Sequence, residues 1–91
     1  MQLEIVSPEA QLFSGEVQSV TVPGTSGSFQ ILNNHAPIVS TLVAGRVKIQ
    51  GTISLDEAHH SKFTQEGNVA YLDIESGAVE LNDNKVILLT D

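Results

Sequence analysis

Three histidines are the side chains best suited to chemistry in this sequence, and none has the neighbours that a catalytic or metal site needs. His59 and His60 are adjacent, so on a strand they would face opposite sides. On a helix Asp56 would lie near His59, a weak metal-binding pattern that a solvated loop explains better. His35 precedes Ala36-Pro37 in a predicted turn, and no Gly-x-Ser-x-Gly motif accompanies it. We therefore expect no catalytic residue and no metal site.

A cofactor site is equally hard to find in the sequence. The stretch Gly24-Thr25-Ser26-Gly27 lacks the lysine and the following helix of a phosphate-binding loop, and it is typical of an ordinary turn. The sequence contains no cysteine, which excludes a disulfide, a thiolate metal ligand and a cysteine nucleophile. We therefore expect no cofactor, and a small hydrolase is disfavoured.

Length and charge exclude further classes of function. The chain of 91 residues is expected to form one domain, residues 1–91. Eleven acidic and four basic residues give a net charge of −7, so there is no basic surface for nucleic acid, and anionic lipid would repel the chain. Its apolar runs are far shorter than the roughly 20 residues of a membrane-spanning helix, and residues 1–4 do not start a secretory signal. We expect a soluble domain that does not insert into a membrane.

Alternating apolar residues predict short strands along most of the chain. In Glu16–Val22, Val17 has an odd number whereas Val20 and Val22 have even numbers, so in one regular strand Val17 would face the other side. This break in the alternation predicts a bulge or a change of sheet near Gln18-Ser19. Residues 69–74 and 85–89 have apolar side chains at both odd and even positions, hence on both faces of a strand, which is typical of strands covered on both sides. Eight or more short strands separated by Gly, Pro and Asn turns predict an all-β, antiparallel sandwich.

The polar segment 51–68 leaves two structures open. Ser54-Leu55-Asp56-Glu57 fits a helix capping box, which predicts a helix of about two turns at 55–62. A long hairpin is the alternative, because isolated helices this short are marginal.

Several motifs occur in the same order as in the N-terminal domain of the ATP synthase epsilon subunits, called delta in mitochondria, which this chain closely resembles. Phe13-Ser14-Gly15 and Asn34-His35-Ala36-Pro37 are the most specific of them. The others are Leu3–Pro8, Ser19–Gly24, Gly27–Leu32, Ser76–Leu81 and Asn84–Asp91. The resemblance covers nearly the whole chain except about 51–68, which is longer than the usual loop and is expected to be a solvated excursion rather than a contact with a neighbour.

The resemblance implies a flattened barrel or sandwich of ten strands in two five-stranded sheets. It also implies a non-catalytic subunit of the central stalk of an F-type ATP synthase, which links the gamma subunit to the polar loops of the c-ring and couples proton translocation to ATP synthesis. Such a subunit would lie at the cytoplasmic face of the bacterial inner membrane as a peripheral part of a hetero-oligomeric complex. Relatives commonly continue into a helical hairpin that inhibits ATP hydrolysis or binds ATP. This chain stops at Asp91, so we expect neither property.

The resemblance also places the two contacts on this chain. The c-ring contact falls on Gly27, Ser28, Phe29 and Asn34. Many relatives have a glutamate in place of Ser28 that faces an arginine of the c-ring loop, and Ser28 can offer only a neutral hydrogen bond there. The alternative is that Ser28 is simply a turn residue.

The gamma contact falls on six consecutive residues, His35, Ala36, Pro37, Ile38, Val39 and Ser40. In a regular strand one of Ile38 and Val39 must point outward. An outward apolar side chain suits an obligate interface, whereas the alternative is that both are ordinary core residues.

A free-standing β-sandwich that binds a ligand such as carbohydrate is the alternative function. Such sites usually present aromatic platforms, but the chain has three Phe, one Tyr and no Trp, and Phe13 and Phe29 stand at expected core positions. Co-purification with gamma and the c-ring separates the two functions.

Overall fold

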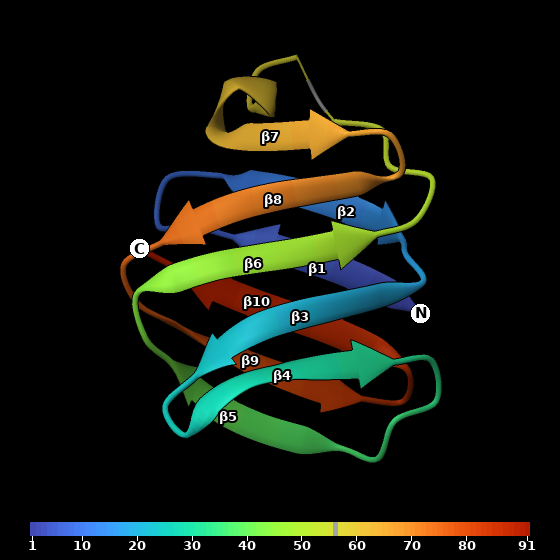
Figure 1. The fold of residues 1–91 in the computed structure, drawn as a ribbon, viewed down its shortest axis with the longest axis vertical. Helices are drawn as coiled ribbons and strands as arrows, with labels where there is room; N and C mark the ends of the chain where they lie inside the picture. The colour runs from blue at the N-terminus through green and yellow to red at the C-terminus, as the bar shows by residue number, and fades with distance from the viewer. Residues whose placement is uncertain (56) are drawn as a thin grey trace.

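The computed structural model describes residues 1–55 and 57–91, and these form ten strands and one turn of 3-10 helix (Figure 1). The strands are β1 (Gln2–Val6), β2 (Gln11–Glu16), β3 (Ser19–Gly24), β4 (Gly27–Leu32), β5 (Ile38–Leu42), β6 (Gly45–Gln50), β7 (Phe63–Glu66), β8 (Val69–Ile74), β9 (Gly77–Asn82) and β10 (Lys85–Thr90). The 3-10 turn, η1, covers His60–Lys62. None of the described residues belongs to a helix long and apolar enough to cross a membrane.

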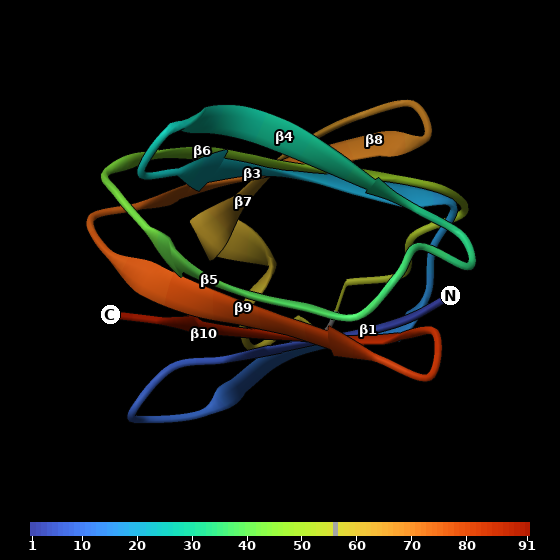
Figure 2. The ribbon, with the colours of Figure 1, turned by 90° about the horizontal axis from the view of Figure 1, so that it is seen from below.

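The strands pack as two layers, which Figure 2 shows face to face. One layer has the order β2-β1-β10-β9-β5, and the other consists of β4-β3-β6-β8-β7. The pairing of Gly24 with Leu42 joins β3 to β5, so the two layers are parts of one curled sheet. This arrangement confirms the predicted all-β sandwich of two five-stranded sheets.

One strand pair departs from the antiparallel expectation. β1 and β10 run parallel, with Leu3 opposite Val86, whereas the other pairs in the described residues are antiparallel. The β1–β2 and β9–β10 units meet here, and no short turn joins β1 to β10. Antiparallel neighbours are often joined by a tight turn, and without one the direction of this pair is set by how the two units pack.

The core lies between the two layers and follows from the alternation along the strands. Inward residues of both layers are completely or almost completely buried. The largest are Leu3, Ile5, Val20, Val22, Ile31, Val47, Ile49, Val79, Leu81, Val86 and Leu88. Each such side chain contributes about 1.5–3 kcal/mol on burial, before the entropy of ordering it is subtracted.

The parity slip at Val17 marks a passage between layers. β2 ends at Glu16 in one layer and β3 begins at Ser19 in the other, with Val17 itself buried. The predicted change of sheet near Gln18-Ser19 is therefore confirmed.

The described residues of the segment 51–68 cover one end of the sandwich, at the top of Figure 1, so the expectation of a solvated excursion was wrong. Ile53 and Leu55 pack against the core and Phe63 is buried. β7 then pairs antiparallel with β8 across a two-residue turn at Gly67, which has φ +60°. The described residues of 55–62 form turns and η1 instead of the two-turn helix, since so short a helix has little stability of its own. The proposed capping box and the Asp56–His59 pattern depend on Asp56, which lies outside the described residues.

The outer faces of β8 and β10 correct another expectation. Both strands were expected to be covered on both sides, yet Leu89 on β10 is 52% exposed, Ile87 is half-buried, and Asp73 on β8 is exposed. Each strand of a two-layer sandwich has only one inner face, so the outward apolar residues of β10 are left without a covering layer.

We predict that Gly77→Ala destabilises the fold through a backbone collision. A Cβ at this position would collide with the carbonyl oxygen of Leu89 on β10. We expect the free energy of unfolding to fall by about 1–3 kcal/mol, measured by urea denaturation. Ser76→Ala, at the exposed neighbouring position, should change it by less than about 0.5 kcal/mol. Equal stability of both variants would contradict this close approach of β9 and β10.

Candidate functional site

One end of the molecule is built from a stretch without charged side chains. From Val17 to Gly45 the sequence contains no Asp, Glu, Lys or Arg, so the eleven acidic and four basic residues all lie elsewhere. This stretch supplies β3, β4 and β5. β4 and β5 lie at the same end of their layers, at the bottom of Figure 1. We call the surface formed by β4, residues 33–37 and β5 the uncharged end.

A side chain from the β9–β10 hairpin holds the turn between β4 and β5. Asn84 Oδ1 accepts a hydrogen bond from the backbone N–H of Asn34 at 2.8 Å, and Asn84 Nδ2 donates to Asn33 Oδ1 at 2.8 Å. The Met1 ammonium also donates to Asn33 Oδ1, at 3.1 Å. Asn34 and Asn84 have φ of 64° and 58°, a region that asparagine tolerates better than most residues. These contacts fix the turn against the β9–β10 turn and the N-terminus, which belong to the middle strands of the β5 layer.

His35 and its neighbours follow this turn and face solvent. The backbone N–H of His35 donates to the carbonyl of Leu32 at 3.2 Å, and its ring Nδ1 lies 2.7 Å from the carbonyl oxygen of Ala36. At that distance from a carbonyl acceptor, Nδ1 carries the proton. Ala36 and Pro37 are exposed. The ring is thus engaged with its own backbone, in an arrangement without a nucleophile.

The structure divides the residues predicted to face the c-ring between the two ends of β4. Gly27, with φ +120°, and exposed Ser28 lie at the β3–β4 turn, whereas Asn34 lies beyond the other end of the strand. Phe29 is half-buried against the core, and its ring lies over Gly24, where an added Cβ would be 2.8 Å from a ring carbon. Ser28 and Asn34 therefore present polar groups to solvent, while Phe29 contributes mainly packing.

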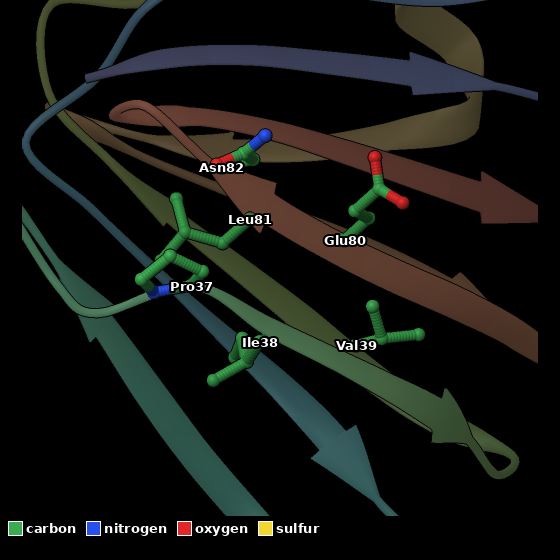
Figure 3. Close-up of a pocket in the computed structure, with 6 residues that line it drawn as sticks. All are labelled: Pro37, Ile38, Val39, Glu80, Leu81 and Asn82. Carbon is green, nitrogen blue, oxygen red and sulfur yellow. The ribbon is translucent and has the colours of Figure 1, made fainter.

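The residues predicted to face gamma form part of a shallow depression on the outer surface of β5 and β9. It is lined by Pro37, Ile38, Val39, Glu80, Leu81 and Asn82 (Figure 3). Val39 is 78% exposed and pairs with Glu80 on β9, while Ile38 is half-buried and packs against the core. Ser40, the last of the predicted set, is half-buried. The prediction that one of Ile38 and Val39 points outward is therefore confirmed.

Exposed apolar side chains gather at the uncharged end and extend beyond it. In residues 1–55 and 57–91 the large apolar side chains with substantial exposure are Leu32, Val39, Val43 and Leu89. The first three belong to the uncharged stretch. Leu89 on β10 pairs with Ala78 on β9, which in turn pairs with the exposed, polar Thr41 on β5. Three of the four exposed apolar side chains thus lie in the uncharged stretch, a concentration that suits a protein interaction site.

The perturbed titratable groups lie outside the stretch Val17–Gly45. Arg46 Nε donates to Asp73 Oδ1 at 2.8 Å, which raises the pKa of Arg46 and lowers the pKa of Asp73, and the Arg46 guanidinium lies 5.3 Å from the Tyr71 ring centroid. The pKa of Asp91 is lowered by hydrogen bonds from the backbone N–H of Glu75 and the hydroxyl of Thr90. These groups are exposed, and exposed ion pairs contribute little to stability.

The described residues contain no cluster of three or more His, Asp or Glu placed to hold a metal ion. The geometry at the uncharged end therefore supports a docking surface better than a reaction centre. Sequence reasoning missed Leu32, Val43, Leu89 and Asn84 as parts of it. The absence of Asp, Glu, Lys and Arg between Val17 and Gly45 could have indicated Leu32 and Val43. Asn84 and Leu89 are distant in sequence from this surface, so no local pattern indicated them.

Comparison with known proteins gives consistent matches along the whole chain. A family profile described as "ATP synthase, Delta/Epsilon chain, beta-sandwich domain" matches residues 1–91. The ATP synthase epsilon chain of Chlorobium limicola is 40% identical over 90 residues, covering 99% of this chain and 88% of the relative. That of Leptospira interrogans is 37% identical over 91 residues, but this chain spans only 61% of its length.

Two solved structures have the same fold. A chain of the Tetrahymena thermophila mitochondrial ATP synthase central stalk and c-ring matches with a TM-score of 0.76 at 15% identity, covering 98% of this chain and 61% of the other. A chain of the Euglena gracilis mitochondrial ATP synthase gives a TM-score of 0.73 at 19% identity, covering 97% and 48%. At these identities the structural matches establish the fold.

We predict that Asn84→Ala loosens the turn and lowers stability. The substitution removes both side-chain hydrogen bonds and places alanine at a positive φ, so we expect a loss of about 1–3 kcal/mol. Urea denaturation measures the loss, and faster amide exchange at Asn34 locates it. Asn82→Ala, on the same hairpin, is the control and should leave both unchanged. Unaltered exchange at Asn34 in Asn84→Ala would show that the contact does not hold the turn.

Proposed function

The chain belongs to the delta/epsilon β-sandwich family of ATP synthase subunits, and we propose that it acts as the non-catalytic epsilon subunit that links gamma to the c-ring in the rotor. The match to epsilon chains along residues 1–91 is the observation that carries this proposal. The enzyme's chemistry then belongs to other subunits, and this chain contributes to coupling proton translocation to ATP synthesis. Its proposed place is the cytoplasmic face of the bacterial inner membrane, where it is held by protein contacts.

The uncharged end supports the proposed placing of the contacts. Val39, with 78% of its surface exposed, and the depression beside it suit an apolar patch of gamma. Burial of a valine side chain contributes about 1.5–3 kcal/mol to association, provided the partner packs closely against it. Val17–Gly45 contains no Asp, Glu, Lys or Arg, so Glu80 beside Val39 is the carboxylate of the depression for which a partner must supply a counter-charge.

The proposed c-ring contact uses polar groups at the two ends of β4. Ser28 can exchange a neutral hydrogen bond with a c-ring loop, worth about 0.5–1.5 kcal/mol net. Asn34 is held in place by Asn84 and presents its side chain to solvent next to the turn. A polar loop that spans β4 would meet both residues, and the exposed Gln30 between them.

The rigidity of the sandwich explains how such a subunit could transmit rotation. Both proposed contacts lie on strands whose inner faces enter the same close-packed core, and packed cores transmit strain with little deformation. A load applied at Ser28 therefore reaches Val39 through β3, which pairs with both β4 and β5.

We predict that Ser28→Lys weakens incorporation into the complex. A lysine there would lose the neutral hydrogen bond of Ser28 and bring an ammonium without a counter-charge into the contact. We expect affinity for epsilon-depleted ATP synthase of the same organism to fall by about tenfold, which is ~1.4 kcal/mol.

Thr64→Lys is the matched control, because Thr64 is an exposed residue of β7 at the opposite end of the same layer. Its affinity should equal that of the unmodified chain. If Ser28→Lys kept its affinity for the depleted enzyme, the proposed contact of Ser28 with the c-ring would be wrong. Failure of the unmodified chain to rejoin the depleted enzyme, or to co-purify with gamma and the c-ring, would remove the function itself.

A further inference from the structure

β4 leaves one edge of its backbone open. Within the described residues it pairs only with β3, through a two-residue turn closed by Gly24 and Gly27. In an antiparallel pair that begins this way, alternate residues exchange hydrogen bonds with the neighbouring strand. Phe29 and Ile31 therefore bond to β3, whereas Ser28, Gln30 and Leu32 direct their N–H and C=O groups away from it.

The contacts of β3 agree with this alternation. Pro23 lies opposite Ser28, and its carbonyl accepts the N–H of Val43 at 2.9 Å on the side away from β4. On the free edge, the carbonyl of Leu32 receives the N–H of His35. The backbone groups of Ser28 and Gln30 and the N–H of Leu32 remain available to a partner.

Edge strands are normally protected against pairing by charged residues, proline, bulges or short length. β4 has six residues without charge or proline. Its pairing with β3 continues without a register shift from Leu32 opposite Ser19 to Gly27 opposite Gly24. Its solvent-facing side chains Ser28, Gln30 and Leu32 are exposed and neutral. A second strand could approach this edge without burying an ionised side chain of β4.

The edges at the other end of each layer have such protection. The pairing of β2 with β1 shifts register between Ile5 and Val6 of β1, and β2 ends in Glu16. β7 has four residues and is flanked by Lys62, with Glu66 at its end. Within the described residues β5 pairs with β3 only at Leu42, so residues 38–41 also have no partner on the side away from β9. Both open edges therefore belong to the uncharged end, and that of β4 is the longer of the two.

We propose that β4 binds an extended, uncharged segment of a neighbouring rotor subunit, which adds a strand to the β4-β3-β6-β8-β7 layer. This inference rests on the proposed function and specifies how one of its contacts is made. The partner supplies backbone groups to Ser28, Gln30 and Leu32 and an apolar side chain beside Leu32, which is 53% exposed. An ionised residue facing β4 would have no counter-charge between Val17 and Gly45, which selects an uncharged segment.

A second copy of this chain is the less suitable partner. Two copies would each bring a net charge of −7 into one small complex, and this repulsion opposes self-association. An uncharged segment from another subunit meets the same backbone groups without bringing a charge of its own to β4.

Amide hydrogen exchange at single residues tests the proposal. In the isolated chain, the N–H groups of Phe29 and Ile31 should be protected, whereas those of Ser28, Gln30 and Leu32 should exchange at nearly unprotected rates. Isotope-labelled chain is then rebuilt into epsilon-depleted ATP synthase of the same organism, exchanged, quenched, extracted and analysed by NMR. We expect exchange at Ser28, Gln30 and Leu32 to slow by at least about tenfold in the assembled enzyme.

Three variants separate backbone pairing from side-chain contact. Gln30→Pro removes an outward N–H, which edge strands tolerate, and should reduce affinity for the depleted enzyme by about tenfold or more. Gln30→Ala keeps the N–H and should bind within about threefold of the unmodified chain. Gln65→Pro makes the same change at the corresponding outward position of β7, where Gln65 pairs with Ala70, and should bind normally. Urea denaturation checks that the proline variants fold, and the exchange measurement decides the matter if they do not.

The outcomes distinguish this proposal from the function on which it rests. If the chain joins the enzyme while Ser28, Gln30 and Leu32 still exchange freely, strand addition is wrong and the rotor function stands. If the chain does not join the enzyme, both are wrong. If these amides become protected in the isolated chain as its concentration and apparent mass rise, the partner is a second copy and the proposal is overturned.

Discussion

The packing of two β-layers across one apolar core is the interaction on which every other feature of this protein depends. Inward residues such as Leu3, Val20 and Leu88 are completely buried, so each strand has one face committed to the interior. The outer faces and the strand edges are what remain for function. Within the described residues the two layers pair only where Gly24 meets Leu42, so β4 and β5 lie at one end of the sandwich with outer surface and open edge side by side. A docking surface at this end follows from the way that the sheet curls.

The distribution of charge gives this end its character. The acidic residues that make the chain strongly negative lie outside Val17–Gly45, where they favour solubility, and Glu80 is the one that borders the depression beside Val39. Desolvating a charge is costly unless it finds a partner, so a surface of backbone groups, amides and aliphatic side chains can be buried at lower cost. The Asn84 contact with the 33–34 turn keeps that surface in one conformation before it binds. Such preorganisation reduces the entropy that association must overcome.

The local pattern of the sequence was enough to predict most of the fold and part of the site. Alternation predicted the strands, the parity of Val17 predicted the passage between layers, and Val39 was expected to point outward if Ile38 did not. Family motifs supplied the number of strands and the candidate contacts. Features set by distant packing could not be read in the same way. The parallel pairing of β1 with β10, the contact of Asn84 with a turn fifty residues earlier, and the exposure of Leu89 all depend on which units meet in three dimensions. The helix considered beside a hairpin for 55–62 does not form in the described residues, where turns and η1 are found and Ile53, Leu55 and Phe63 pack with the core.

Burial of the uncharged end in the rotor is the central claim, and cysteine labelling in the assembled enzyme tests it most directly. The chain has no cysteine, so Val39→Cys and Thr64→Cys each introduce a single reactive thiol, one at the uncharged end and one on β7. Both variants should react rapidly with a maleimide as isolated chains. After assembly into epsilon-depleted ATP synthase, the thiol at position 39 should become protected while the thiol at position 64 stays reactive. Equally rapid labelling at position 39 before and after assembly would contradict the account.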